Sequence, residues 1–320
     1  MTAIVGILNK RGIAIAADSA VTFTNAIQEV AIQNKNEKVI SVKDKVVNSG
    51  DKMLRLKDKQ PVAVMIVGNS LLSKLPWDVI IRCYRKQNDS SGFSKLEDYV
   101  QHFKSFVDSE ILSVYLKRDE SFEENKRTIL VFAGYGEDES YPSICKYEVT
   151  GITKLKLQWQ PCRSATISDE LESIIFTSGQ SDIIDAIELG IQSDRIGVIR
   201  RKFQDLIDNL LTENMLDILK DKIDYSAIRE EITDLITESE RDHLRQHMEA
   251  IKHFDLQKMA CLAENLIKAT ELHRKITYQQ ESVGGLIDLA VITREDGFQW
   301  LNRKSWYEPS KGGQYGKFGI

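Results

Sequence analysis

Thr2-Ala-Ile-Val-Gly-Ile-Leu8 opens the chain and, together with Gly12-Ile-Ala-Ile-Ala-Ala17, decides its fold. Both runs are short and almost continuously apolar, and the residues between them, Asn9-Lys10-Arg11-Gly12, are typical of a turn. The two runs therefore predict a β-hairpin. Because neither run alternates apolar with polar residues, we expect both strands to be covered on both faces.

The hairpin places one carboxylate near the start of the chain. A turn near Lys10 pairs positions whose numbers sum to about 20, which sets Thr2 opposite Asp18 with Cβ atoms about 5 Å apart. Removal of Met1 would leave a free α-amine on Thr2. The local pattern therefore predicts a carboxylate beside a threonine amine.

The first part of the chain mixes strand and helix signals. Short apolar runs bounded by turn residues predict further strands near 38–42, 52–56, 61–67, 128–133, 143–149, 154–158 and 176–179. Apolar residues at three- and four-residue spacings predict helices near 70–86, 95–116 and 182–189. The remainder of 23–51 is polar, and we expect it to be irregular.

The sequence pattern changes after about residue 190. Residues 198–283 contain neither Gly nor Pro and have the apolar period of amphipathic helices, after which 284–292 and 298–301 return to strand. We therefore divide the chain into a discontinuous core, 1–190 with 276–305, a helical insertion, 191–275, and a C-terminal tail, 306–320. Added packing, a partner-binding arm and a lid over the site are all open as roles for the insertion.

Composition excludes several classes of protein. The 320 residues are 42% hydrophobic and 28% charged, which is average for a globular protein, and the net charge of -5 argues against a nucleic-acid partner. No apolar run approaches the length of a membrane helix, and no signal peptide is recognisable. Four scattered cysteines are typical of reduced thiols, so we expect a cytoplasmic protein without a membrane or nucleic-acid partner.

Several motifs in order resemble the N-terminal-nucleophile hydrolases, and among them proteasome β subunits and the bacterial protease subunit HslV. The motifs are Thr2-Ala-Ile-Val-Gly6, Ile15-Ala-Ala-Asp18-Ser19, Asp51-Lys52-Met-Leu-Arg-Leu56, Val67-Gly68-Asn-Ser70, Phe132-Ala-Gly-Tyr-Gly-Glu-Asp138, Phe176-Thr-Ser-Gly179 and Ser282-Val-Gly-Gly285. The resemblance implies an α+β fold: a four-layer αββα sandwich, with two antiparallel sheets between helical layers, that here carries a long helical insertion.

The resemblance also implies a catalytic set. Thr2 would attack a carbonyl through its Oγ, with its own α-amine as the base. Lys52 would hold a positive charge beside that amine, and Asp18 would orient Lys52. The N–H of Gly68 would stabilise the oxyanion, and Ser178 would form a hydrogen bond near the amine. No cofactor or metal is implied.

Two features depart from the family pattern. The stretch between Asp18 and Lys52 is about twice the family length, so Lys35 and Lys38 stay open as alternatives to Lys52, which is favoured by the Met-Leu-Arg-Leu run that follows it. Proteasome β subunits have an Asp and a Ser where this chain has Gln280 and Val283. The supporting network around the nucleophile is therefore expected to differ.

Each residue also has an ordinary structural interpretation. A threonine after the initiator methionine is common, Asp18 and Gly68 suit turns, Lys52 suits a surface, and Ser178 suits a helix cap. His243 and His247 have a metal-compatible i,i+4 spacing, but a solvated helix face is the better interpretation. The functional hypothesis therefore depends on the whole set rather than on any single residue.

By resemblance, the preferred function is a threonine peptidase that hydrolyses peptides or unfolded proteins. Two alternatives stay open: an inactive structural or binding subunit, and an amidohydrolase acting on a small molecule. The family hides its nucleophile inside stacked rings, so we expect a homo-oligomer, in the form of a ring or double ring, with an ATP-driven unfoldase as a further partner.

The first prediction concerns the N-terminus. We expect the purified protein to begin at Thr2, because only then does the free α-amine belong to the nucleophilic residue. Intact-mass spectrometry and N-terminal peptide mapping measure this directly. Quantitative retention of Met1 would contradict the catalytic interpretation.

Overall fold

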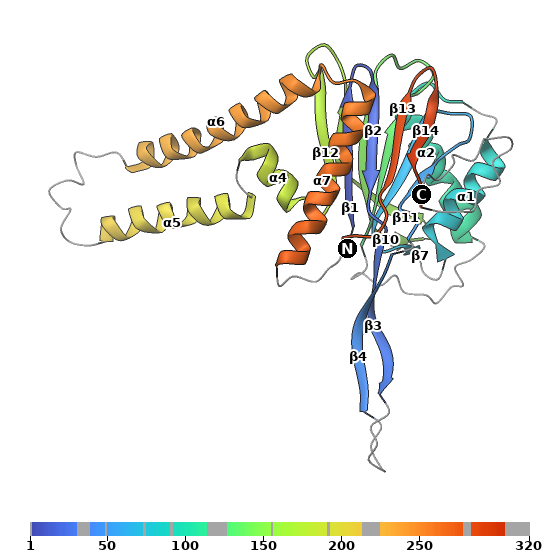
Figure 1. The fold of residues 1–320 in the computed structure, drawn as a ribbon, viewed down its shortest axis with the longest axis horizontal. Coiled ribbons are helices and arrows are strands. Elements are labelled where there is room, and N and C mark those ends of the chain that lie inside the picture. The colour runs from blue at the N-terminus through green and yellow to red at the C-terminus, as the bar shows by residue number, and fades with distance from the viewer. Residues whose placement is uncertain are drawn as a thin grey trace, which may run out of the picture.

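The computed structural model describes residues 2–30, 39–48, 50–72, 75–89, 92–113, 127–154, 156–190, 193–212, 225–277 and 283–304. The fold is a mixed α/β arrangement with two five-stranded antiparallel sheets (Figure 1). The predicted tail, 306–320, and Lys35, Lys38, Gln280 and Ser282 lie outside the described residues.

The first sheet has the strand order β12-β1-β2-β13-β14. Its strands are β1 (Ala3–Asn9), β2 (Gly12–Ala17), β12 (Ser173–Gly179), β13 (Asp288–Thr293) and β14 (Gly297–Asn302). The predicted hairpin is confirmed as β1 and β2, and every residue of both strands is buried. The predicted coverage of both strand faces is therefore also confirmed.

The register of the hairpin corrects the sequence prediction by one position. Ile4 pairs with Ala17 and Asn9 pairs with Gly12. Because only Lys10 and Arg11 separate the strands, the paired positions sum to one more than expected. The backbone N–H of Asp18 donates to the Ala3 carbonyl at 3.2 Å and the Ala3 N–H donates to Asp18 Oδ1 at 2.9 Å, so Asp18 lies opposite Ala3.

The second sheet has the strand order β11-β10-β9-β6-β5. Its strands are β5 (Met53–Arg55), β6 (Val62–Gly68), β9 (Thr128–Gly134), β10 (Ser143–Thr153) and β11 (Lys156–Thr166). All of them fall on the strands predicted from apolar runs, although β10 and β11 are longer than expected.

A separate two-stranded ribbon corrects the expectation of an irregular polar segment. β3 (Ala20–Val30) pairs with β4 (Val39–Asn48), and the ribbon leaves the body at the end of the first sheet where β1 begins (Figure 1). The strand predicted near 38–42 falls on β4, whereas β3 was not predicted as a strand.

The helices largely follow the predicted periods. They are α1 (Trp77–Asn88), α2 (Leu96–Phe106), which continues as the π-helix η1 (Val107–Leu112), α4 (Asp182–Leu189), α5 (Ser193–Thr212), α6 (Tyr225–Ile251) and α7 (Leu256–Ile276). The first begins later than expected, because the short strands β7 (Leu71–Leu72) and β8 (Leu75–Pro76) precede it. Pro76 is its N-cap, a position that requires no intrahelical N–H.

Alternate residues of β1 explain its continuous apolar run. Ile4 and Leu8 pack towards the second sheet, in a core with Met65 and Val131. Ala3, Val5 and Ile7 belong to a different core, which contains α7 residues such as Ala263 and Ile267. Both faces of β1 are therefore buried from solvent. The sequence predicts this, because its residues do not alternate between apolar and polar.

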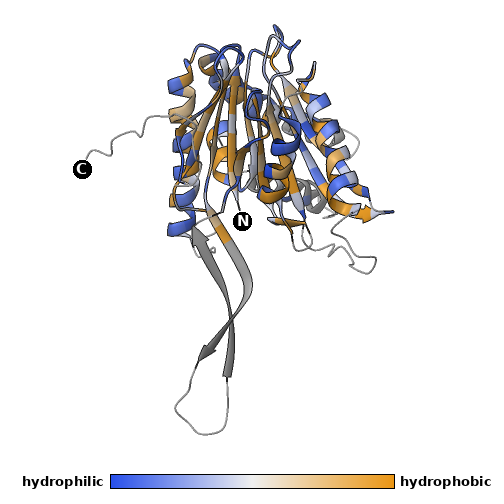
Figure 2. Ribbon diagram, turned by 90° about the vertical axis from the view of Figure 1, so that its right-hand side faces the viewer, coloured by the Kyte–Doolittle hydropathy of each residue, from blue (hydrophilic) through white to orange (hydrophobic). Residues whose placement is uncertain are grey.

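A third core covers the outer face of the second sheet. Val64 and Phe132 from this sheet pack with Trp77 of α1 and Phe103 of α2. Figure 2 shows the same distribution, with hydrophobic residues along the strands and on the inward faces of the helices. Asn9, which is buried in the hairpin turn, donates to the carbonyls of Ile251 and Phe254 at 3.0 and 2.9 Å and so ties the turn to the junction between α6 and α7.

The predicted helical insertion contains two kinds of helix. α7 packs on β1 and β2, whereas α5 and α6 extend side by side away from the sheets (Figure 1). Arg200 of α5 pairs with Glu240 of α6 at 3.5 Å. Phe203 and Leu235 are 47% and 60% exposed, whereas Ile251 at the end of α6 is buried in the core with α7.

The close approach of β12 to the start of β1 generates the second prediction. Gly179 has φ +89°, and a Cβ atom there would lie 1.9 Å from the Thr2 carbonyl oxygen. We expect Gly179→Ala to lower the free energy of unfolding by about 2 kcal/mol or more, since backbone must move. Gly151→Ala is the matched control, because its Cβ meets nothing within 4 Å. Equal denaturant midpoints for the two variants would contradict the prediction.

Candidate functional site

A buried carboxylate lies at the centre of the predicted site. Asp18 follows the end of β2 and is 0% exposed. Its Oδ1 accepts hydrogen bonds from the Ala3 N–H at 2.9 Å and from Lys52 Nζ at 2.8 Å. Its Oδ2 accepts from the N–H groups of Ala20 and Gly284 at 3.1 and 3.2 Å. Four separate segments therefore meet at one side chain.

Lys52 is brought to Asp18 by the start of the second sheet. It directly precedes β5, and its carbonyl accepts from the Ile66 N–H at 2.8 Å. Its side chain is 7% exposed. Burial lowers the pKa of Lys52 below its usual value, while the Asp18 carboxylate opposes that change by favouring the charged ammonium.

Thr2 lies at the buried end of β1, next to this ion pair. It is 5% exposed, and the following residue, Ala3, donates its N–H to Asp18. The Thr2 carbonyl accepts from the Gln180 N–H at 2.8 Å. The start of β1 is thus held between Asp18 on one side and β12 on the other.

Ser178 is also brought to this end of the sheet. It pairs with Ile4 across β12 and β1 and is 3% exposed. Its Oγ has no hydrogen-bond partner among the described residues. A buried hydroxyl without a partner has its full hydrogen-bonding capacity available for another group.

Gly68 adjoins the cluster through its neighbour. The Val67 side chain lies 3.3 Å from where a Cβ of Gly179 would stand, and Gly68 ends β6. Its φ is +84°, and a Cβ would lie 2.4 Å from the Arg127 carbonyl oxygen, so the position requires glycine. The backbone conformation and the close Arg127 carbonyl are therefore sufficient to explain why a glycine occupies position 68.

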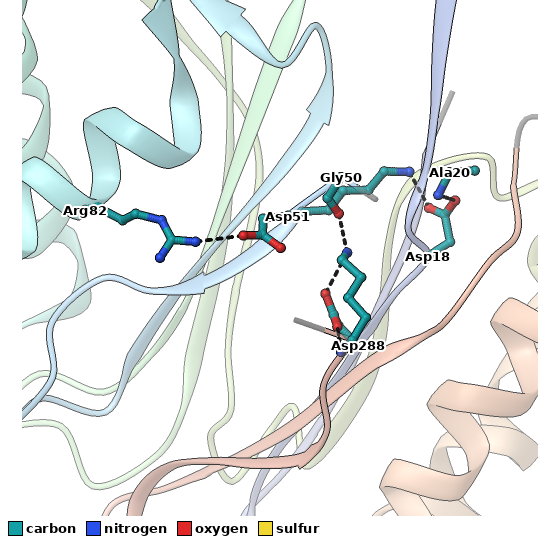
Figure 3. A network of polar contacts seen from close by, with 8 residues as sticks. Asp18, Ala20, Gly50, Asp51, Arg82 and Asp288 are labelled. Atoms are coloured by element: carbon teal, nitrogen blue, oxygen red, sulfur yellow. Dashed lines mark hydrogen bonds and ion pairs between the residues drawn. The ribbon is translucent and has the colours of Figure 1, made fainter. Parts of the chain in front are cut away.

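A second buried ion pair beside Lys52 was not predicted from the sequence. Lys304 Nζ lies 2.9 Å from Asp288 Oδ2, and the Lys304 N–H donates to Asp288 Oδ1 at 3.0 Å. Lys304 Nζ also donates to the Gly50 carbonyl (Figure 3). Asp288 interrupts the apolar run 284–292, which is a sequence signal that could have identified it, whereas Lys304 has none.

The structure accounts for one of the two positions, 280 and 283, at which the sequence departs from proteasome β subunits. Val283 is buried in the core with α7, and Gly284 supplies a backbone N–H to Asp18. That contact does not depend on the side chain at 283. Gln280 lies outside the described residues.

The other features considered as sites do not bring functional residues together in the described part of the chain. The rings of His243 and His247 are 6.2 Å apart on α6, and the described part of the chain contains no group of three or more His, Cys, Asp or Glu that could hold a metal. A cavity of about 280 Å³ at β10 and β11, lined in part by Glu97, Cys145 and Arg163, includes none of the predicted site residues. Among the described helices, none has the length and hydropathy needed to cross a bilayer.

Comparison with known proteins does not identify a family. No family model matches the chain, and no curated protein matches it. Among solved structures, the chain is similar to a Gly-1 mutant of Anbu from Hyphomicrobium sp. strain MC1, with 13% identity, a TM-score of 0.42, and coverage of 95% of this chain and 86% of that one. The assignment to proteasome β subunits and HslV suggested by the motifs is therefore wrong as a family assignment, because a similarity this distant and the lack of any family match do not support it.

The four hydrogen bonds to Asp18 generate the third prediction. We expect Asp18→Asn to lower the free energy of unfolding by about 3 to 5 kcal/mol, since it leaves the Lys52 ammonium buried without its counter-charge. Urea denaturation at neutral pH measures this. Adding Lys52→Met should recover part of the loss, because both members of the pair are then removed.

Asp169→Asn is the matched control for Asp18→Asn. Asp169 pairs with Lys10 at 2.8 Å, but its side chain is 85% exposed. Removing that pair should change the free energy of unfolding by less than about 1 kcal/mol. An Asp18→Asn variant as stable as Asp169→Asn would show that the buried pair does not hold these segments together.

Proposed function

We propose that this protein is a hydrolase that uses Thr2, exposed by removal of Met1, as an N-terminal nucleophile to cleave amide bonds. One observation carries the proposal: a buried Lys52–Asp18 ion pair, 2.8 Å between Nζ and Oδ1, whose carboxylate also binds the amide of the residue after Thr2. A buried ion pair gives little net stability, so its position beside a potential nucleophile favours a chemical role.

The proposed reaction begins at the amine. A free α-amine has a pKa of about 7.7–8.0 and can accept the Thr2 Oγ proton at neutral pH. Oγ then attacks the substrate carbonyl carbon, and the C–O bond forms as the carbonyl electrons move to oxygen. The α-ammonium returns its proton to the leaving nitrogen as the C–N bond breaks. Water then hydrolyses the Thr2 ester and regenerates the hydroxyl.

The surrounding residues have supporting roles in this proposal. A charged Lys52 favours the neutral amine by repulsion, and Asp18 keeps the Lys52 ammonium oriented. The Gly68 N–H is proposed to stabilise the oxyanion, an interaction that typically contributes about 3 kcal/mol. The unpartnered Oγ of Ser178, at the same end of the sheet, is available to bind near the amine.

We infer a peptide amide as the substrate, and an amide of a small molecule stays the alternative, because the nucleophile does not choose its substrate. We also infer that the two sheets and the packed helices form the four-layer αββα sandwich expected from sequence. The three hydrophobic cores, one between the sheets and one outside each, support that arrangement. The core and insertion boundaries, the homo-oligomeric ring and the ATP-driven unfoldase partner stay predictions.

The fourth prediction tests the nucleophile. We expect Thr2→Ala to reduce hydrolysis of a fluorogenic peptide library by roughly a thousand-fold or more, because no hydroxyl is left to form the ester. Thr2→Ser should retain measurable activity, since serine keeps both hydroxyl and amine. Equal rates for wild type and Thr2→Ala would refute the proposal, and an inactive wild type with unblocked Thr2 would favour the non-catalytic alternative.

Lysine variants extend the same assay. Lys52→Ala and Lys52→Arg should both lose most activity, because arginine does not place a compact charge at the same point. Lys35→Ala and Lys38→Ala are the matched controls and should keep it. Inactivation by one of the controls instead would show that Lys52 is not the lysine of this site.

A further inference from the structure

We propose that the buried pair Lys304–Asp288 is a positioning element of the Thr2 site: it holds the Gly50 carbonyl and so fixes the short segment that presents Lys52 to Asp18. This inference rests on the proposed function. Lys304 lies two residues after the end of β14 and Asp288 begins β13, so both are far along the chain from Lys52.

The contacts of Lys304 leave it little freedom. Its side chain is 5% exposed and that of Asp288 is 3% exposed. Its backbone N–H and its ammonium bind the two different oxygens of the same carboxylate, at 3.0 and 2.9 Å. The ammonium also donates to the Gly50 carbonyl (Figure 3).

The Gly50 carbonyl lies two residues before Lys52, so a movement of Gly50 would also displace Lys52. The Gly50 N–H donates to the Ser19 carbonyl at 3.1 Å, directly after Asp18. The next residue, Asp51, accepts from Arg82 of α1 at 2.7 Å (Figure 3). Segment 50–52 is therefore held by the link between β2 and β3, by α1 and by the pair Lys304–Asp288, with Lys52 as its last residue.

Gly50 lies close to the base of the ribbon. A Cβ at this position would lie 2.2 Å from Val21 Cγ2, which shows how closely the base of the ribbon approaches it. A glycine backbone is intrinsically free to rotate, so its conformation must be set by its partners. The ammonium of Lys304 is the charged partner among them.

The electrostatics indicate a role beyond stability. Lys304 lies near enough to Lys52 that its charge lowers the pKa of Lys52, while Asp288 acts in the opposite direction. Placing two ammonium groups in one buried region is unfavourable unless each is compensated. An apolar pair could fill the same space, but it could not donate to the Gly50 carbonyl.

The test compares three variants with a surface control. Lys304→Met should reduce kcat for peptide hydrolysis by about ten-fold or more with KM changed less than about two-fold, because a displaced Lys52 affects the reacting groups rather than substrate binding. Lys304→Arg should recover part of kcat, since it can still donate to both partners. Lys10→Met, which removes an exposed pair with Asp169 and Glu172, should match wild type.

The double variant Lys304→Met/Asp288→Leu separates positioning from stability. Replacing a buried ion pair with apolar residues is often neutral for folding. We expect its thermal midpoint to return towards that of wild type while kcat stays low. Recovery of kcat together with the midpoint would overturn the inference, because the pair would then serve stability alone.

A readout that needs no turnover distinguishes this inference from the proposed function. NMR titration of protein labelled at lysine Cε, with the Lys52 signal assigned by Lys52→Arg, reports the pKa of Lys52. We expect Lys304→Met to raise it, since a neighbouring positive charge is removed. If wild type hydrolyses no substrate, the proposed function fails, and an unshifted Lys52 titration would then overturn the positioning inference separately.

Discussion

The rest of the site depends on one buried carboxylate. Asp18 is fully covered, and an ionised carboxylate in such a place is tolerated only when its oxygens are bound. Its two oxygens bind the amides of Ala3, Ala20 and Gly284 and the ammonium of Lys52. The requirement to satisfy one charge thus joins the start of β1, the base of the ribbon, the approach to β13 and the start of the second sheet.

Two long segments are inserted between the parts of the chain that meet near Asp18. Between Asp18 and Lys52 the chain forms the β3–β4 ribbon, and the pairing of Ala20 with Asn48 closes its base. That closure brings Gly50 back to Ser19, so an unusually long segment still delivers Lys52 to Asp18. The helices α5 and α6 are a second excursion, which leaves after α4 and returns through α7 to the face of the first sheet.

The charges around Lys52 are balanced in pairs. Lys52 faces Asp18, and Lys304 faces Asp288, with both pairs almost completely removed from water. The Lys304 ammonium disfavours the charge on Lys52, whereas the carboxylates of Asp18 and Asp288 favour it. The ionisation of Lys52 therefore depends on all three of the charged side chains around it.

The sequence by itself indicated most of the elements and several residues of the candidate site. The unbroken apolar runs of β1 and β2 predicted buried strands, because a strand covered on both faces needs apolar residues at every position. It also indicated Thr2, Asp18 and Lys52. The hairpin register was one position off, since the exact turn is set by hydrogen bonding between the strands. Of the ribbon, the strand predicted near 38–42 falls on β4, whereas most of its partner β3 lies in the segment that was expected to be irregular. Only the tertiary structure decided that Lys304 and Asp288 stand beside Lys52, because contacts between residues hundreds of positions apart come from how the sheets pack, which no local pattern encodes.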